Sequence, residues 1–537
     1  MKSDIPVIDL FAGPGGLGEG FASISDFFRI ELSVECSEPA HKTLQLRAFK
    51  RILERENLSL DCYYDYLHGY VLSPVTAHSK SAWELGKAEA LRLRLGEPED
   101  DETLALELER RKQKLCDDWV LLGGPPCQAY SPVGRVRNRS KRGYVPEDDE
   151  RHYLYREYLK LIQHYRPAVF VMENVKGILS SRVGGEKIFH QILRDLTEPD
   201  KALGRSSNGP GYRIHSIVDS DIVYRAGDDP SLFTDNAFVV AAENYGVPQA
   251  RHRIFLVGVR EDIRVNPGQL QHTTTSPLRS VLSDLPTLRS GLSRRDSPES
   301  WRAAIRTCAG RLVAEADEAG DHYLAADIAR FSKSINSAPL SARGGLRIPG
   351  DERSTKPAVP GLHDSALRRW LEDSNLSVWL NHESRGHMPN DLGRYLFATV
   401  FARLEGRSPV GPRDFALPSV APQHASWKSG SFADRFRVQL WDEPAKTITS
   451  HISKDGNYYI HPDPEQCRSL TVREAARIQT FPDNYFFEGN RTEQYHQVGN
   501  AVPPWLARQL ATVVRDLLTR ARRDESDGKE CLQTRRI

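Results

Sequence analysis

The chain has 537 residues, of which 39% are hydrophobic and 27% charged, a composition typical of a globular protein and not of a membrane protein. A single core rarely extends beyond roughly 250–300 residues, so we expect at least two domains. The formal net charge is +1, so the bulk charge gives no support for a nucleic-acid ligand, and only local cationic clusters could provide one.

The seven cysteines are sparse and include no Cys-x-x-Cys pair. Such a set is typical of a reducing cytoplasm and argues against a disulfide framework and against structural zinc. The first apolar run is short and is interrupted by Asp4 and Asp9, so we expect neither a secretion signal nor a membrane segment. These features predict a cytoplasmic protein.

The N-terminal elements are those of half a nucleotide-binding α/β domain. The pattern predicts a strand over 6–11, a glycine-rich turn, a helix from 17 to about 27, and a second strand over 30–35 that ends in a carboxylate, Glu35. This order, with an acidic residue at the end of the second strand, is typical of sites for adenosine-containing cofactors.

Residues from about 75 to 118 are heavily charged and helical in pattern, and we interpret them as a solvated helical insertion. Three apolar runs then predict buried strands at 119–122, 168–172 and 254–259. If these strands are parallel, the polar motifs at their carboxyl ends meet at one edge of the sheet.

The composition changes between about 262 and 441, where Ser, Pro, Thr and Gly become frequent and the helix and strand patterns weaken, which indicates a separate, loop-rich domain. Regular patterning returns near Leu470 and ends with a helix at about 505–523. The expected division is therefore 1–262 and 442–523 for the main domain, 263–441 for the smaller domain, and 524–537 for a polar, frayed tail.

The turn from Gly13 to Gly18 satisfies the Gly-x-Gly-x-x-Gly pattern, which alone is a weak signal and is also met by plain tight turns. Its glycines would let the backbone approach a ligand closely, and Phe11 places an aromatic ring beside it. Because Glu35 at the next strand end could bind the hydroxyl pair of a ribose, we favour cofactor binding.

Cys127 follows two prolines and a pair of glycines at the end of a predicted strand. Most lone cysteines are inert and buried, but one held on a rigid loop above a cofactor edge is a candidate thiolate nucleophile. Glu173 ends the neighbouring strand, where burial would raise its pKa and let it carry a proton near neutral pH. Capping of the next helix is the alternative role for Glu173.

Arg251 and Arg253 alternate before a strand, so both would point to one face and flank an anionic or oxygen-rich substrate, although surface arginines are the plainer interpretation. Cys127 and Glu173 together explain one reaction. Attack of a thiolate on C6 of cytosine, helped by a proton or hydrogen bond at N3, lets C5 attack a sulfonium methyl group. In duplex DNA the base must first leave the stack.

The chain resembles the bacterial type of the cytosine-C5 DNA methyltransferase family. Six blocks occur in the family's order across nearly the whole chain, which chance does not explain. The blocks are 9–16, 124–128, 173–175, 249–253, 470–477 with 481–482, and 499–504. The resemblance implies an α/β, Rossmann-like S-adenosylmethionine-dependent methyltransferase fold with an inserted, smaller target recognition domain.

The resemblance also implies roles for single residues. Cys127 would be the nucleophile, Glu173 would contact N3 and the exocyclic amine of a flipped cytosine, and Arg251 and Arg253 would support the base and the cysteine loop. The residues expected to bind S-adenosylmethionine are Phe11, Gly13, Gly15, Gly16, Leu17, Glu35, Asp65, Pro126, Leu154, Asn500 and Val502.

Within that set, Glu35 would bind the ribose, Leu154 would lie under the adenine, and Asn500 with Val502 would close the methionine side. The family usually has an acidic residue near the adenine soon after the second strand. The charged insertion blurs that position, and Asp65 is the best candidate for it.

A cationic cluster bounded by Gly134 and Gly143 follows the cysteine motif. In the family this segment is a mobile loop that closes over DNA, while a solvated basic loop is the plainer interpretation. The expected DNA-binding residues are Arg135, Arg137, Arg139, Lys141 and Arg142. The recognition region differs freely between members, so its sequence gives no target site.

Three other functions compete with methylation of double-stranded DNA. A tRNA-methylating branch of the family shares the Cys and Glu blocks but carries a Cys-Phe-Thr motif that this sequence lacks. A nicotinamide-dependent oxidoreductase rests on the glycine pattern alone, and a DNA-binding module without activity would have lost Cys127 or Glu173. We therefore expect a DNA (cytosine-5-)-methyltransferase that acts as a monomer, and pairing with a restriction endonuclease in a restriction-modification system is a further hypothesis.

Overall fold

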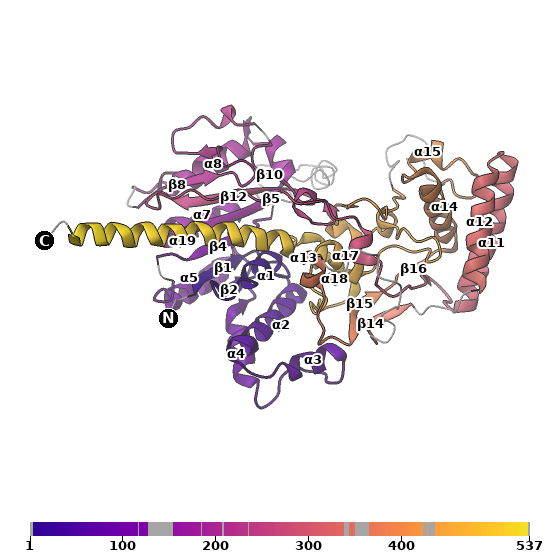
Figure 1. Cartoon of the computed structure of the whole chain (residues 1–537), viewed down its shortest axis with the longest axis horizontal. Coiled ribbons are helices and arrows are strands. Elements are labelled where there is room, and N and C mark those ends of the chain that lie inside the picture. Colours follow the sequence, from indigo (N-terminus) through magenta and orange to yellow (C-terminus); the bar gives the residue numbers. More distant parts are fainter. Residues whose placement is uncertain are drawn as a thin grey trace.

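The computed structural model has an α/β lobe that carries both ends of the chain and a second lobe at the far end of the long axis (Figure 1). The residues that the structure describes are 4–115, 117–126, 154–183, 185–206, 209–234, 236–337, 343–349, 365–422, 427 and 435–534. In these ranges no helix is both long and apolar enough to cross a membrane.

The α/β lobe is built on a nine-stranded sheet. Eight of its strands lie side by side in the order β3 (Ala90–Leu91), β2 (Phe28–Val34), β1 (Ile5–Leu10), β4 (Val120–Gly123), β5 (Val169–Val175), β12 (His252–Arg260), β8 (Tyr212–His215), β9 (Val223–Tyr224), and β10 (Val239–Ala241) also pairs with β12. The strands from β3 to β5 are parallel, whereas β12 runs antiparallel to β5. The mixed pattern differs from the expectation that all the motif-bearing strands are parallel.

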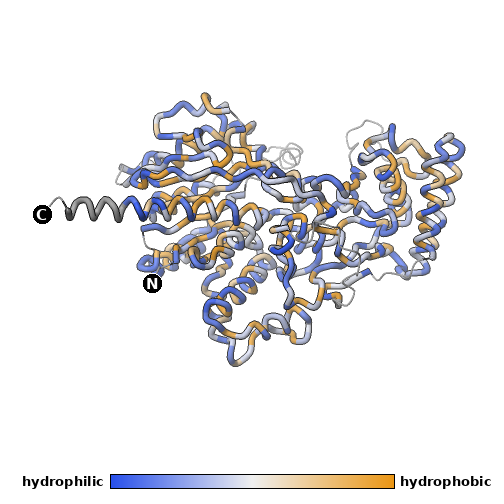
Figure 2. Tube along the Cα trace, viewed as in Figure 1, coloured by the Kyte–Doolittle hydropathy of each residue, from blue (hydrophilic) through white to orange (hydrophobic). Residues whose placement is uncertain are grey.

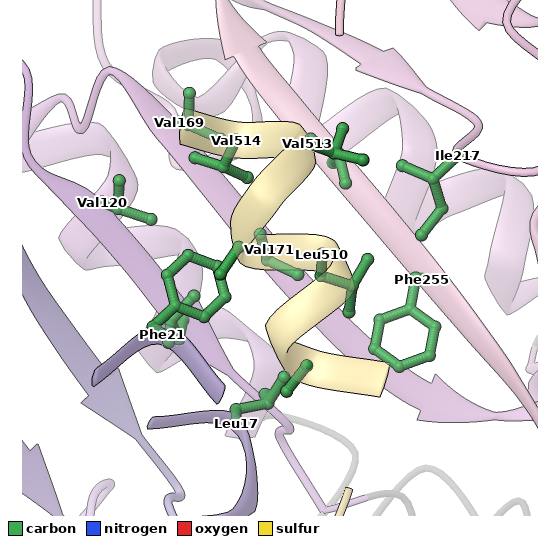
Figure 3. Packing of buried hydrophobic residues seen from close by; sticks show 14 of the residues in the cluster. Leu17, Phe21, Val120, Val169, Val171, Ile217, Phe255, Leu510, Val513 and Val514 are labelled. Carbon is green, nitrogen blue, oxygen red and sulfur yellow. The ribbon is translucent and has the colours of Figure 1, made fainter. Parts of the chain in front are cut away.

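Helices cover both faces of this sheet. One face packs against α1 (Gly16–Ala22) and α19 (Pro504–Thr534), and the other against α5 (Pro98–Arg111), α7 (Leu154–Tyr165) and α8 (Ile188–Thr197). Figure 3 shows Leu510, Val513 and Val514 of α19 above Val169, Val171 and Phe255 of the sheet. The strands between these layers are apolar on both sides because both faces are buried.

The last helix is longer than the sequence pattern predicts, since α19 continues through Thr534 and includes most of the segment expected to be a frayed tail. Its start lies against the start of α1, so the C-terminal helix completes the layer that the N-terminal helix begins (Figure 1). The helix expected at 505–523 is therefore confirmed, but its C-terminal end lies later in the sequence than expected.

The segment 75–118 is more than a helical insertion. It contains α4 (Lys80–Glu89) and α5, but between them β3 pairs in parallel with β2 and extends the main sheet. The strand was missed because it has two residues and lies between two strongly charged helices. Next to it, α2 (Glu38–Arg55) and α3 (Asp61–His68) cover this end of the lobe.

The second lobe is helical, which corrects the expectation of a loop-rich domain. Its cluster of buried apolar residues lies among α11 (Pro298–Glu318), α12 (His322–Ser337) and α14 (Pro389–Glu405). Along α11 the buried positions Trp301, Ile305, Ala309, Leu312 and Ala316 recur every three or four residues, as one helical face requires. Polar and apolar stretches alternate along α11 and α12 in Figure 2.

A third group of elements lies between the two lobes. Residues from 278–288 and 445–501 share one apolar cluster with α13 (Ala366–Leu371) and β15 (Val378–Glu383). In this group are also α10 (Arg279–Leu282), α17 (Val472–Ile478) and α18 (Arg491–Asn500). Of the described residues after 441, Val502 and α19 share a cluster with the main sheet, whereas most buried apolar residues of 445–501 belong to this middle group.

The remaining elements are short. The small pairs are β6 (Arg182–Val183) with β7 (Glu186–Lys187), β11 (Gln249–Ala250) with β17 (Ala445–Lys446), β13 (Gly291–Leu292) with β16 (Gly386–His387), and β14 (Gly344–Pro349) with β15. The short helices are α9 (Pro199–Ala202) and α15 (Gly411–Asp414).

The contact between α1 and α19 predicts a difference between two glycines in helices. A Cβ atom added at Gly20 would lie 2.4 Å from Cβ of Ala507, whereas one added at Gly310 in α11 would meet no heavy atom within 4 Å. We expect Gly20→Ala to destabilise the fold by about 1–3 kcal/mol through overpacking. Gly310→Ala should stabilise it by about 0.5–1 kcal/mol, because alanine is the better helix former.

Scanning calorimetry of the two variants beside the parent protein measures this difference as shifts of the melting temperature in opposite directions. A Gly20→Ala protein that melts at or above the parent temperature would show that α1 and α19 are not in close contact.

Candidate active site

The motifs meet at one edge of the main sheet. The parallel strands β1, β4 and β5 end there, and β12 begins there because it runs in the opposite direction. In the register of β5 and β12, Glu173 lies opposite Phe255 and Val175 opposite Arg253. A motif that precedes an antiparallel strand therefore lies at the same edge as motifs that follow parallel strands.

The turn after β1 has the backbone shape of a ligand cradle. The φ angles are 55° at Phe11, 58° at Gly13 and 95° at Gly15, values in the left-handed region that glycine adopts without strain. A Cβ atom at Gly13 would have no heavy atom within 4 Å, so the turn is open on that side. The open turn fits a cofactor that approaches the main chain closely.

Glu35 is the carboxylate that closes this cradle. Its Oε2 accepts a hydrogen bond from the Gly13 amide at 2.9 Å, and its Oε1 accepts one from the Ser37 amide at 2.7 Å. The Cys36 thiol also donates to Oε1, and these bonds fix the carboxylate beside the glycine turn, where Oε2 retains a lone pair for a ribose hydroxyl. The geometry fits the adenosine part of S-adenosylmethionine.

Asp9 lies beneath the same turn and is buried. Its Oδ2 accepts a hydrogen bond from the Gly18 amide at 3.1 Å, which holds the first turn of α1 against β1. Burial raises the pKa of Asp9 to about 7, and the Gly18 amide and Arg51 partly oppose that shift. The sequence places Asp9 in a motif, but its contact with α1 is visible only in the structure.

The far end of the chain reaches the turn from the other side. A Cβ atom at Gly16 would lie 2.1 Å from the carbonyl oxygen of Val502, so only glycine allows this approach. Tyr485, which the sequence did not indicate, is buried and donates a hydrogen bond from its hydroxyl to the Pro14 carbonyl. The exposed Asn500 side chain lies 3.2 Å from Nδ1 of His496.

The second part of the site is a partly buried carboxylate, Glu173, with two arginines. Nε of Arg253 lies 3.0 Å from Oε1 of Glu173, and their side chains are 16% and 14% exposed. Arg251 is buried and donates from Nη1 to the Ile448 carbonyl at 2.8 Å. A Cβ atom at Gly124 would lie 3.3 Å from Oε2 of Glu173, so the cysteine motif starts beside this carboxylate.

The charges of this group oppose one another. Burial raises the pKa of Glu173, and the guanidinium groups of Arg253 and Arg251 pull it back. Burial also lowers the pKa of Arg251 and of Arg253. Burial therefore favours the protonated form of Glu173 while the two arginines favour the ionised form, an arrangement that suits a group which gives or accepts a proton.

Other expected site residues fall in different places. Leu17 lies in the apolar core below α1, and Asp65 lies on α3, whose buried residues pack toward β15. Leu154 begins α7, and a Cβ atom at Gly96 would lie 3.4 Å from its Cδ2. Pro126 is partly buried just after the cysteine-loop glycines.

The segment after β3 was missed as part of the site. The Glu35 amide donates a hydrogen bond to the Leu91 carbonyl at 3.1 Å, and Gly96 lies next to Leu154. Residues 91–96 therefore run from Glu35, the expected ribose ligand, toward Leu154, the residue expected under the adenine. Two expected groups lie outside the described residues: Cys127, and the cluster Arg135, Arg137, Arg139, Lys141 and Arg142.

An open glycine turn with a fixed carboxylate, at the carboxyl edge of a Rossmann-like sheet, is the architecture of an S-adenosylmethionine-dependent methyltransferase. The chain belongs to the family of C-5 cytosine-specific DNA methylases, whose model matches residues 102–200 and 233–515. It is thus a DNA (cytosine-5-)-methyltransferase that uses S-adenosylmethionine.

Curated relatives extend this result. The chain is 32% identical over 533 residues to the Type II methyltransferase M.Bpa9945I of Bacillus paralicheniformis, covering 95% of this chain and 99% of the relative. It is 28% identical over 408 residues to the Type II methyltransferase M.AgeI of Thalassovita gelatinovora, covering 74% and 82%.

A solved structure has the same fold. It is a putative DNA modification methyltransferase encoded within a prophage of E. coli, with a TM-score of 0.50 and 18% identity over 96% of this chain and 100% of that one.

The position of Glu35 predicts a loss of cofactor affinity in Glu35→Gln. The substitution replaces one of the two carboxylate oxygens by an NH2 donor and removes the negative charge. We therefore expect binding of S-adenosylmethionine to weaken about tenfold or more, which corresponds to about 1.4 kcal/mol or more. Isothermal titration calorimetry measures this constant without DNA.

Glu31→Gln is the matched control, because Glu31 lies in the middle of β2 and pairs with Arg29 and Lys114 instead of bordering the glycine turn. Equal affinities for Glu35→Gln and the parent protein would show that Glu35 does not bind the cofactor.

Proposed function

We propose that the enzyme methylates C5 of a flipped cytosine within a specific duplex DNA sequence, through a covalent bond between Cys127 and C6. The observation that carries the proposal is the partly buried pair of Glu173 and Arg253 beside Gly124, where the chain leads toward Cys127. It lies at the same sheet edge as the open glycine turn, so a base and a methyl donor would meet there.

Glu173 would hold and protonate the base. Arg253 engages Oε1, which leaves Oε2 for N3 or the exocyclic amine of cytosine. In its protonated form, which burial favours because it raises the pKa of the carboxyl group, Glu173 would donate to N3. The buried Arg251, anchored to the Ile448 carbonyl, would keep positive charge behind the carboxylate and support the cysteine loop.

The residues of this chain would act in a fixed order. The Cys127 thiolate bonds to C6 while Glu173 supplies a proton or hydrogen bond at N3, and the displaced electron pair makes C5 nucleophilic. S-adenosylmethionine supplies the methyl group as a sulfonium. Loss of the C5 proton to a base and departure of the Cys127 thiolate from C6 then restore the aromatic ring.

The remaining parts of the proposal concern partners. Arg135, Arg137, Arg139, Lys141 and Arg142 would bind DNA phosphates, and the region 263–441 would select the target sequence. The type II names of the relatives support a role as the modification enzyme of a restriction-modification system paired with an endonuclease. We further propose that the enzyme acts as a monomer in the cytoplasm.

Transfer of label from methyl-labelled S-adenosylmethionine to unmethylated phage DNA tests the reaction. We expect label on cytosine C5 at one short motif, no turnover with Cys127→Ser, and a loss of about 10²–10⁴-fold in kcat with Glu173→Gln, the range typical of a lost general acid. Cys308→Ser, which changes a cysteine in α11 far from the sheet edge, should stay active.

A parallel reaction with unmodified tRNA separates the nearest alternative. Label on tRNA with DNA left unlabelled would replace the proposal by a tRNA cytosine-5 methyltransferase. Label on DNA with an active Cys127→Ser protein would exclude the covalent mechanism.

A modification enzyme should also protect DNA in cells. In a host that expresses the protein, we expect the chromosome to carry 5-methylcytosine at the motif found in vitro and to resist an endonuclease that cuts at that motif. Bisulfite sequencing of the host DNA measures the modified fraction, with the Cys127→Ser protein as the control. Sites that remain unmodified in a host with active soluble enzyme would contradict the protective role.

A further inference from the structure

Two glutamines with fully buried side chains lie between the arginines and the cofactor turn. Gln249 is in β11, directly before the arginine pair, and Gln479 follows α17. Nε2 of Gln249 donates to Oε1 of Gln479 at 2.9 Å, so the two amides join segments 230 residues apart in sequence.

Each amide group uses both of its N–H donors and accepts one hydrogen bond at its oxygen. Gln249 accepts from the Ile448 amide at 2.7 Å and donates also to the Ile478 carbonyl at 3.4 Å. Gln479 donates to the carbonyls of Val498 at 2.6 Å and Ala501 at 3.2 Å. A rotated amide would place oxygen against carbonyl oxygen, so the network has one orientation only.

One end of the network holds the base side of the site. The amide of Ile448 donates to Gln249, and its carbonyl accepts from Arg251, so both polar groups of one residue are bound by the arginine segment. The Thr447 hydroxyl adds a hydrogen bond to the Ala250 carbonyl at 2.6 Å. A shift of Gln249 therefore moves the anchor of Arg251.

The other end holds the cofactor side. The Val498 and Ala501 carbonyls belong to the end of α18, and the next residue is Val502, whose carbonyl lies against Gly16. The end of α18 is tightly packed against Ser450, since a Cβ atom at Gly499 would lie 2.3 Å from the Ser450 amide nitrogen. A shift of Gln479 therefore moves the residues that border the glycine turn.

We propose that Gln249 and Gln479 are positioning residues that couple the cofactor turn to the base-side arginines. The proposal rests on the proposed function, in which Arg251 and Arg253 support the base. Neither glutamine borders the glycine turn or pairs with Glu173. The two amides form a rigid polar connection in the apolar middle group, so a displacement at one end is transmitted to the other.

The test uses Gln249→Met, Gln479→Met and the double variant, because methionine keeps the length of the side chain and removes its hydrogen bonds. Each single variant should weaken binding of S-adenosylmethionine about tenfold in calorimetry without DNA, and also lower kcat about tenfold at saturating cofactor with unmethylated phage DNA, typical magnitudes for coupled sites. The double variant should lose no more cofactor affinity and no more kcat than the more strongly affected single variant, since either change breaks the same connection.

Gln466→Met is the matched control, because this buried glutamine accepts from the Leu288 amide and from Arg468 in the middle group and has no contact with either site. It should lower the melting temperature to a similar extent and leave kcat and the cofactor affinity unchanged. Additive losses, or a Gln249→Met protein with normal cofactor affinity, would overturn the coupling. The calorimetry needs no DNA, so it decides this point even if methylation of DNA is not observed.

Discussion

The reversed direction of β12 is the constraint on which the catalytic geometry depends. In a sheet of parallel strands only the residues that follow a strand reach the carboxyl edge. Because β12 runs the other way beside β5, residues that precede it reach this edge as well, and Arg253 comes within 3.0 Å of Glu173. The buried carboxylate and its counter-charge thus derive from neighbouring strands with a fixed register.

That pairing also limits how the site can be built. A buried ionised carboxylate without a partner is costly, and its pKa rises until the group is neutral. At Glu173 burial raises the pKa, and the two arginines oppose part of that rise. Arg251 is desolvated in turn and donates to the main-chain carbonyl of Ile448. The middle group of elements therefore supports this side of the site.

Much of this arrangement follows from local sequence signals. Strongly apolar runs located β1, β4, β5 and β12, and the glycine pattern with Glu35 located the cradle, because these features depend on residues close together in the chain. The two-residue β3 has no such signal, and the Ser- and Pro-rich surroundings of α11 and α12 hid a helical periodicity that their buried faces show.

Individual hydrogen bonds between distant segments could not be predicted, although the meeting of the motifs at one site could be. The bond from Tyr485 to Pro14 and the amide pair of Gln249 and Gln479 join residues that are hundreds of positions apart. The block 470–477 could be recognised as a motif, but its role in the fold could not. Arg473 binds the carbonyls of Leu380, Pro482 and Tyr485 from a fully buried position, so this part of the motif organises the middle group.

The position of α19 has a consequence for the synthesis of the protein. The face of the sheet that carries Val169, Val171 and Phe255 is covered by a helix that starts at residue 504. At about 5–20 residues per second, a ribosome reaches that helix roughly 25–100 s after initiation. Until then the nascent chain presents an uncovered apolar sheet and an unclosed glycine turn. A chaperone would have to shield this surface, and a polypeptide released early would not acquire the complete cofactor site.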